Sequence, residues 1–280
     1  MKNVLLPTDF SDNSWNAIVY ALHYFKQEQC NFYLLHVNTL DNLIVGDTAY
    51  IPTQTEILDV YIKPAKHKLR QLLKRVSDSV KPNSKHRFYT LTDHSFIIES
   101  IRKHVREKHI DIIVMGTKGA SGLREYIIGS NAGDVITKVK CTTLIVPENA
   151  QFKPHQEIAF PTDFTMSYDI QTLQPISELL SHKSAVLRIL HITKKSAALN
   201  KEQEHNRELI EEFFDEFDYS FHFLTNSKLE DAIQCFVESR DIDIIVMVAK
   251  NLNYFQHILF HTRVEKISYH TEIPFLVLHE

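Results

Sequence analysis

Three glycines and a serine stand at fixed spacing in one stretch of the chain, and these residue types suit a phosphate-binding site. Gly116 is followed by Gly119, and then, after nine residues, by the pair Gly129-Ser130. Glycine lacks a Cβ atom, so its backbone can approach a ligand closely and can adopt positive φ. The N–H groups of such a turn, together with those that begin a helix, attract anions. The spacing therefore predicts a loop that cradles phosphate.

Two cationic residues lie in the same loop. The spacing of the glycines differs from that of the commonest phosphate-binding motifs. Lys118 and Arg124 could offset phosphate charge, although solvated loop residues of this kind are also common. The chain contains neither G-x-x-x-x-G-K-[ST] nor G-x-G-x-x-G after a strand. The alternative interpretation is that the glycines are ordinary turn and helix-cap residues.

The sequence around the loop predicts the elements that position it. Ile112–Met115 is a short apolar run rich in β-branched residues, which is typical of a buried parallel strand. An apolar-periodic segment opens at Gly129-Ser130 and predicts a helix. A second apolar run, Leu144–Val146, predicts a strand that ends before Pro147. The order is strand, glycine loop, helix, strand.

Strands and helices alternate along the first half of the chain, which predicts an α/β fold. The other strands are expected at residues 2–6, 31–37 and 87–91, and helices after residue 11, at about 56–80 and from Asp93 onward. Such alternation gives an open parallel sheet with helices on both faces. Ligands bind at the carboxyl ends of its strands, where the strand order reverses. The turn Pro7-Thr8-Asp9 and the glycine loop both follow strands, so they are expected to form one site.

The second half of the chain repeats the first. Residues 160–165 (FPTDFT) repeat residues 6–11 (LPTDFS), and residues 241–247 (DIDIIVM) repeat residues 109–115 (HIDIIVM). We therefore predict a tandem duplication, with domains at residues 1–148 and 155–280 and two tandem doubly wound five-stranded parallel sheets. The four motif residues are replaced in the second copy, which predicts a loss of the phosphate cradle there; the replacements are Val248, Asn251, His261 and Thr262.

Composition narrows the class of protein. The 280 residues are 44% hydrophobic and 24% charged with a net charge of −4, as in a globular protein of about two domains, and this charge argues against nucleic-acid binding. Without an apolar run of about 20 residues or a signal peptide, a cytoplasmic protein that does not enter the membrane is expected. His257, His261 and Glu265 have zinc-like spacing, but no metal site is predicted, because 16 histidines make chance pairs common. No catalytic set is predicted either.

The pattern Gly116-x2-Gly119-x9-Gly129-Ser130 resembles the ATP-binding signature of the universal stress protein family. The resemblance covers nearly the whole chain, twice. It implies an adenine nucleotide alpha hydrolase-like (Rossmann-like) fold that holds ATP, with or without Mg²⁺, between the first and fourth strands. It also implies that Asp9 lies beside the nucleotide and that the Val37 backbone meets adenine. The predicted ATP-binding residues are Pro7, Thr8, Asp9, Val37, Met115, Gly116, Thr117, Lys118, Gly119, Gly129, Ser130 and Asn131.

The resemblance further implies an ATP-binding regulatory protein of stress responses. A slow ATPase or nucleotidyl enzyme and a scaffold without nucleotide remain as alternatives, and ATP, AMP and cyclic nucleotides are not distinguished. For Asp9 the alternative role is that of a turn or helix cap, because the repeat retains Asp163. Family members commonly dimerise through the fifth strand. The two halves are therefore expected to form an intramolecular pseudo-dimer through Leu144–Val146 and Leu276–Leu278, with further homo-oligomers open.

Overall fold

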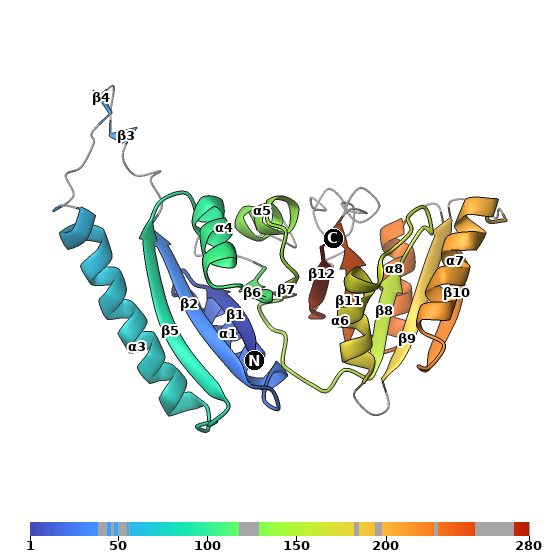
Figure 1. Cartoon of the computed structure of the whole chain (residues 1–280), viewed down its shortest axis with the longest axis horizontal. Coiled ribbons are helices and arrows are strands. Elements are labelled where there is room, and N and C mark those ends of the chain that lie inside the picture. Colours follow the sequence, from blue (N-terminus) through green and yellow to red (C-terminus); the bar gives the residue numbers. More distant parts are fainter. Residues whose placement is uncertain are drawn as a thin grey trace. The chain divides into compact units, whose positions relative to one another are not determined.

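The computed structural model divides the chain into two compact units, with the boundary between Asn149 and Ala150 (Figure 1). We call the part before this boundary unit 1 and the part after it unit 2. The structure describes residues 1–38, 44–45, 48–49, 55, 57–117, 129–181, 185–193, 198–226, 229–249 and 272–279.

Unit 1 contains a five-stranded parallel sheet in the order β7-β6-β1-β2-β5. The strand order reverses between β1 and β6, because β2 and β5 extend the sheet on one side and β7 on the other. This is the doubly wound arrangement that the sequence predicted. The strands are β1 (Lys2–Pro7), β2 (Cys30–Asn38), β5 (His86–His94), β6 (Ile112–Gly116) and β7 (Thr143–Val146).

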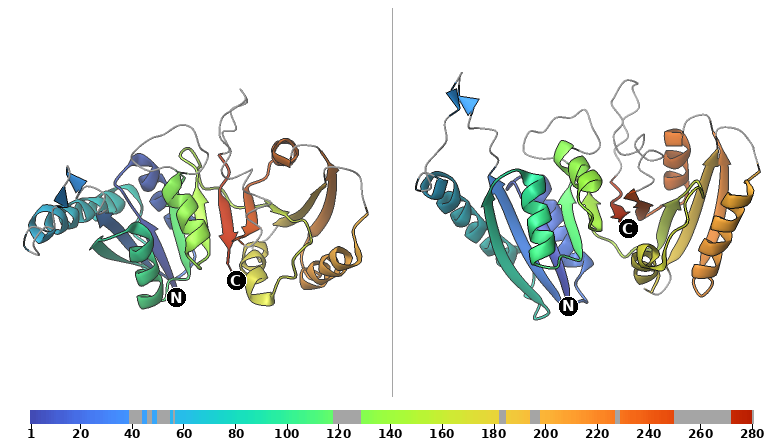
Figure 2. Two further views of the ribbon diagram at one scale, coloured as in Figure 1. Left: turned by 90° about the horizontal axis from the view of Figure 1, so that it is seen from above. Right: turned by 45° about the horizontal axis from the view of Figure 1, so that its top comes forward.

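Helices connect these strands and cover both faces of the sheet (Figures 1 and 2). Right-handed crossovers place α1 and α3 on one face and α4 and α5 on the other. Ser11 caps α1 by accepting a hydrogen bond from the Ser14 N–H. The helices are α1 (Asp12–Tyr24), the π-helix η2 (Ile57–Ile62) leading into α3 (Lys63–Ser79), α4 (Ile97–Glu107) and α5 (Ser130–Lys138). A small antiparallel pair, β3 (Ile44–Val45) with β4 (Thr48–Ala49), lies between β2 and η2.

Unit 2 repeats this sheet with the strand order β10-β9-β8-β11-β12, again all parallel. Each strand of unit 2 corresponds to one strand of unit 1: β8 to β1, β9 to β2, β10 to β5, β11 to β6 and β12 to β7. Its elements are β8 (Glu157–Pro161), α6 (Ile170–Leu180), β9 (Val186–Thr193), α7 (Lys201–Phe213), β10 (Tyr219–Thr225), α8 (Leu229–Ser239), β11 (Ile244–Val248) and β12 (Phe275–Leu278).

Two predicted element boundaries need correction. Asp93 does not begin a helix; it belongs to β5, and α4 starts at Ile97 after the cap residue Phe96. The Asp93 carboxylate instead accepts hydrogen bonds from Ser100 and His104 of α4, at 2.6 and 2.8 Å. The predicted helix at 56–80 has a π-helical first part, and regular α-helix begins at Lys63 next to Pro64. Proline lacks an N–H donor and is therefore well tolerated in the first turn of a helix.

Candidate functional site

The candidate site lies where β1 and β6 stop pairing. These neighbouring strands are paired only through Val4 with Ile112 and Leu5 with Ile113. However, β1 remains paired with β2 as far as Pro7, and β6 remains paired with β7 as far as Gly116. The carboxyl ends of β1 and β6 therefore part at the point of strand-order reversal, where ligands of doubly wound sheets bind. Pro7 and Gly116, which the sequence placed directly after the two strands, are their last residues in the structure.

A hydrogen-bonded turn follows β1 and fixes Thr8 and Asp9. The Thr8 N–H donates to the Leu35 carbonyl of β2 at 2.8 Å, which anchors the turn to the sheet. The Thr8 hydroxyl accepts from the Phe10 N–H at 3.1 Å and lies 2.9 Å from the Ser14 hydroxyl of α1. Phe10 has φ of 67°, a left-handed conformation that is uncommon outside glycine. The side chain of Thr8 thus organises the turn around this strained residue.

Asp9 also stabilises the turn. Its Oδ1 atom accepts from the Ser11 N–H at 3.1 Å and from the Ser11 hydroxyl at 2.6 Å. In unit 2, Asp163 Oδ1 accepts from the Thr165 N–H and hydroxyl at 3.0 and 2.8 Å. The same geometry in both units supports the turn interpretation for this oxygen of Asp9.

The backbone of Val37 is directed toward the site. The Cys30 N–H bonds to Lys85, on the β5 side, whereas the Leu35 carbonyl accepts from Thr8, on the β1 side. Because backbone polar groups alternate along a strand, those of Val37 point toward β1, beyond the last β1 residue. Within the described part of the chain, no hydrogen-bond partner meets the Val37 N–H or C=O groups on this side. They are open to a ligand that carries both a donor and an acceptor.

The N-terminus of α5 is held directly beyond β6. The Gly129 N–H donates to the Thr117 carbonyl at 2.5 Å, and the Thr117 N–H donates to the Val146 carbonyl of β7 at 3.2 Å. Gly129 precedes the helix with φ of −67° and provides no side-chain cap. The first intrahelical bond runs from the Gly133 N–H to the Gly129 carbonyl. Ser130 and Asn131 are exposed, and among the described residues their N–H groups have no hydrogen-bond partner, so they can meet an anion.

Gly116 is required by the close approach of α1. A Cβ atom at Gly116 would lie 2.1 Å from Asn13 Oδ1, far inside any van der Waals contact. Asn13, in the first turn of α1, was not among the predicted site residues. The signal in the sequence was weak, because an asparagine near a helix start normally indicates only a cap.

Some predicted residues lie outside the part of the chain that the structure describes. In the glycine loop these are Lys118, Gly119 and Arg124. In the second half they are three of the four replacements and the histidine pair with its glutamate, namely Asn251, His257, His261, Thr262 and Glu265.

Unit 2 differs from unit 1 at this edge. Val248, which stands at the position of Gly116, ends β11 with a branched side chain that is 1% exposed. The helix α6 begins at Ile170 after its cap Asp169, whereas α1 begins three residues after Asp9 of the repeated motif. Two side chains of α7, Gln203 and Asn206, donate at 2.8 Å to backbone carbonyls of the turn at Asp163 and Phe164. Side chains thus occupy this end of unit 2.

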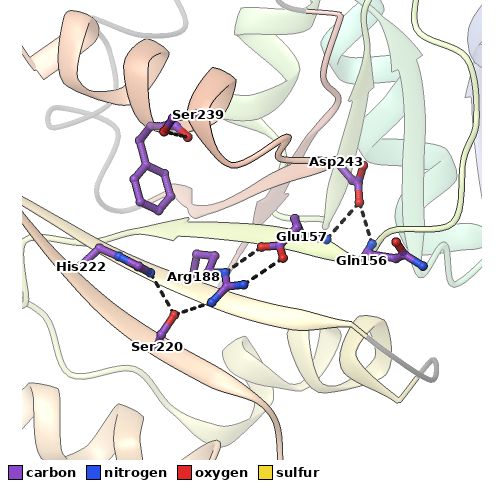
Figure 3. A network of polar contacts seen from close by, with 8 residues as sticks. Gln156, Glu157, Arg188, Ser220, His222, Ser239 and Asp243 are labelled. Carbon is purple, nitrogen blue, oxygen red and sulfur yellow. Dashed lines mark hydrogen bonds and ion pairs between the residues drawn. The ribbon is translucent and has the colours of Figure 1, made fainter.

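A second polar network lies on the sheet of unit 2 (Figure 3). Arg188 of β9 donates to both carboxylate oxygens of Glu157, at 2.6 and 2.8 Å, and to the Ser220 hydroxyl at 2.9 Å. The Ser220 hydroxyl also lies 2.9 Å from His222 Nε2. The hydrogen bond to Glu157 raises the pKa of Arg188 above its usual value. Because Glu157 and Ser220 lie near the amino ends of their strands, this network is remote from the ligand edge of unit 2 and braces the sheet.

Other candidate groups do not form a catalytic set. Ser100 and His104 both bond to the same oxygen of Asp93, so the serine is not aligned with the histidine as a nucleophile. Burial raises the pKa of the Cys30 and Cys141 thiols to about 12, which keeps them protonated at neutral pH. Among the residues placed in the structure, no group of three histidine, cysteine or acidic side chains could hold a metal ion.

The fold and the strand ends define the class of this chain: a doubly wound α/β protein with its candidate ligand edge at the point of strand-order reversal. The sequence model of the universal stress protein family matches residues 1–147, and the chain belongs to this family. The resemblance found in the sequence is therefore confirmed. Within the described ranges, no helix is long and apolar enough to span a bilayer.

Individual relatives support this assignment. Universal stress protein YxiE of Bacillus subtilis is 28% identical over 155 residues, which cover 52% of this chain and 98% of the relative. Universal stress protein MJ0531 of Methanocaldococcus jannaschii is 24% identical over 152 residues, covering 52% of this chain and 81% of the relative. The crystal structure of a universal stress protein from Archaeoglobus fulgidus matches with a TM-score of 0.69 at 17% identity, over 98% of this chain and 97% of that one. This last match shows that a known fold spans both halves.

Proposed function

We propose that this chain is a regulatory protein of stress responses that binds an adenine nucleotide, with ATP held in unit 1. The observation that carries the proposal is the uncapped N-terminus of α5, fixed one residue beyond β6 by the bond between Gly129 and Thr117. Its N–H groups at Ser130 and Asn131 and the positive end of the helix dipole favour phosphate oxygens.

The remaining groups at this edge suit the rest of the nucleotide. Adenine presents a donor and an acceptor side by side, which matches the open N–H and C=O of Val37. The predicted loop residues Lys118 and Gly119 are assigned to the phosphates on the sequence pattern alone. Mg²⁺ would arrive with the phosphates, whose oxygens are its preferred ligands. As a protein of this class, the chain would act through nucleotide-dependent binding of partners rather than rapid turnover, in the cytoplasm.

The test changes the charge at the start of α5. Glutamate at position 130 would favour the helix dipole but repel phosphate, so Ser130→Glu should retain or slightly raise Tm while weakening ATP binding. We expect a loss of about fivefold or more in affinity, since like charges placed together in this way are unfavourable by at least about 1 kcal/mol. Calorimetric titration of the full chain with ATP and Mg²⁺ measures the affinity.

The matched control is Lys201→Glu. Lys201 is likewise the first residue of a helix, α7 of unit 2, and lies outside the proposed site. This variant should bind ATP like the wild type. A wild-type chain without measurable ATP binding, or a Ser130→Glu variant with unchanged affinity, would refute the proposal.

A further inference from the structure

Asn13 is a buried polar residue with no partner, and it lies at the ligand edge of unit 1. The residue is 6% exposed, and both polar atoms of its carboxamide are closed to solvent. Among the described residues, neither atom has a hydrogen-bond partner. Such groups are rare, because each buried amide atom without a partner lowers the stability of the folded state.

The position of Asn13 connects this orphan group to the glycine motif. Its side chain lies against Gly116, the last residue of β6, at the place where β1 and β6 have stopped pairing. The absence of a side chain at Gly116 is what gives the carboxamide its space. One residue further along the chain, Thr117 holds the start of α5. Asn13 and the free N–H groups of α5 thus flank the same strand end.

The neighbouring asparagine of α1 has an ordinary structural role. The Asn16 side chain donates to the Pro147 carbonyl at 3.0 Å, which ties α1 to the end of β7. Both residues lie on α1, yet only the carboxamide of Asn13 is buried without a partner. The hydrogen bond to Pro147 explains the position of the Asn16 side chain, and no such bond within the described residues explains that of Asn13.

Unit 2 retains neither member of the pair. The position of Asn13 in the repeated motif is Ser167, which is exposed and precedes the helix, and the position of Gly116 is Val248, which is buried. The pair of carboxamide and glycine thus occurs in unit 1 and not at the corresponding motif positions of unit 2, although the Thr172 hydroxyl in the first turn of α6 is also buried without a partner among the described residues.

We infer that Asn13 is a nucleotide-binding residue, whose Nδ2 donates to an oxygen of the β- or γ-phosphate. This inference rests on the proposed function, since it needs a phosphate at this edge. A bound phosphate supplies the acceptor that the amide lacks, and the hydrogen bond to a charged oxygen is stronger than one to a neutral group. The ligand-free protein is less stable than it would be with an apolar side chain here, and nucleotide binding removes that penalty.

The experiment compares Asn13→Leu, which has nearly the same shape and no polar atoms, with Asn16→Leu. For Asn13→Leu we expect ATP affinity to fall by roughly 10- to 100-fold, as for the loss of a hydrogen bond to a charged group. AMP affinity should stay the same, because AMP lacks the β- and γ-phosphates. The Tm of the ligand-free protein should equal or exceed that of the wild type, by about 2–4 °C for a gain of 1 kcal/mol. For Asn16→Leu we expect the reverse, with a lower Tm and unchanged ATP affinity.

The outcomes separate this inference from the proposed function. A wild-type chain that does not bind ATP refutes both. A wild-type chain that binds ATP, with Asn13→Leu binding equally well, overturns only the role of Asn13. Equal losses for ATP and AMP, or a lower Tm in ligand-free Asn13→Leu, would show that the residue acts structurally. If Asn13→Leu fails to fold, Asn13→Ala is measured in the same way, with the same affinities deciding.

Discussion

At the scale of single residues, the turn after the first strand is held by the same histidine contacts in both units. His36 Nδ1 lies 2.8 Å from the Thr8 carbonyl, and His191 Nδ1 lies 3.0 Å from the Thr162 carbonyl. Each histidine ring also packs against the phenylalanine of its turn, with ring centroids 4.5 and 4.9 Å apart. The turn after the first strand is therefore a feature of the fold. Asn13 and Gly116 differ between the units, since unit 2 has Ser167 and Val248 at these positions of the repeat.

Gly116→Ala tests the steric part of this difference. The added methyl group would meet the Asn13 carboxamide, so we expect the free energy of unfolding to fall by about 1–3 kcal/mol, as for other overpacked cores. In the double variant Gly116→Ala, Asn13→Ala the clash is removed. Denaturant unfolding should then show a loss smaller than the sum of the two single losses. Additive losses, or a Gly116→Ala variant as stable as the wild type, would contradict the steric explanation.

At the scale of elements, the two outermost strands on one side of each sheet, β2 and β5 in unit 1 and β9 and β10 in unit 2, carry different side chains at equivalent positions. In unit 1, Tyr33 of β2 stacks on Tyr89 of β5 with ring centroids 5.0 Å apart. In unit 2 the matching pair is Arg188 of β9 and Ser220 of β10, joined by a hydrogen bond (Figure 3). A stacked aromatic pair has thus been exchanged for a charged network, with the strand register unchanged. We expect this network to make the stability of unit 2 depend on pH.

His222 is the titrating member of the network. Burial, followed by the positive charges of Arg240 and Arg188, lowers its pKa below the usual value of 6.5. The unfolded chain therefore takes up a proton at this residue at a higher pH than the folded chain does. The stability that the neutral ring contributes is complete above about pH 6.5 and is lost as the pH falls through the lower pKa of the folded state.

His222→Gln should remove this pH dependence while retaining an amide near Ser220. The difference in free energy of unfolding between the variant and the wild type should be constant above about pH 7 and should change in favour of the variant toward pH 5. Urea unfolding at a series of pH values measures it. The control is His205→Gln, at an exposed histidine of α7 that lies outside the network. If the difference between His222→Gln and the wild type does not vary with pH, the proton of His222 does not contribute to stability.

At the scale of the whole molecule, one sheet topology occurs twice with different ligand edges. In both units the two central strands separate after two paired residues. In unit 2, β8 and β11 are paired only through Ile158 with Ile244 and Ala159 with Ile245. In unit 2, Val248 and the side chains of α7 occupy that edge. We therefore expect a single nucleotide site per chain. The pseudo-dimer of the two halves through Leu144–Val146 and Leu276–Leu278 remains a prediction.

Stoichiometry tests the asymmetry of the two units. Titration of the full chain with ATP should saturate near one nucleotide per chain, and Ser130→Glu should weaken that single site. Equilibrium dialysis with labelled ATP gives the number directly. Two sites of similar affinity, or one site that Ser130→Glu leaves intact, would place nucleotide in unit 2 and contradict the asymmetry.

The local sequence was sufficient to predict the doubly wound fold, the repeat and the start of α5 directly after Gly129. Buried parallel strands appear as short apolar runs, and a glycine before an amphipathic segment indicates a helix start, so neither needs distant contacts. The extension of β5 through Asp93 was missed, because it depends on hydrogen bonds from Ser100 and His104 that form only when α4 packs.

Only the tertiary structure decided which groups at the site are free. Asp9 and Val37 look equally available in the sequence, yet the Oδ1 of Asp9 is used by its own turn while the Val37 backbone points beyond the end of β1. The sequence does not indicate that Asn13 belongs to the site, because Asn13 lies more than 100 residues before Gly116. Only the folded sheet brings the two residues together. Whether a polar group has a partner depends on contacts between distant segments. Local residue patterns do not predict those contacts.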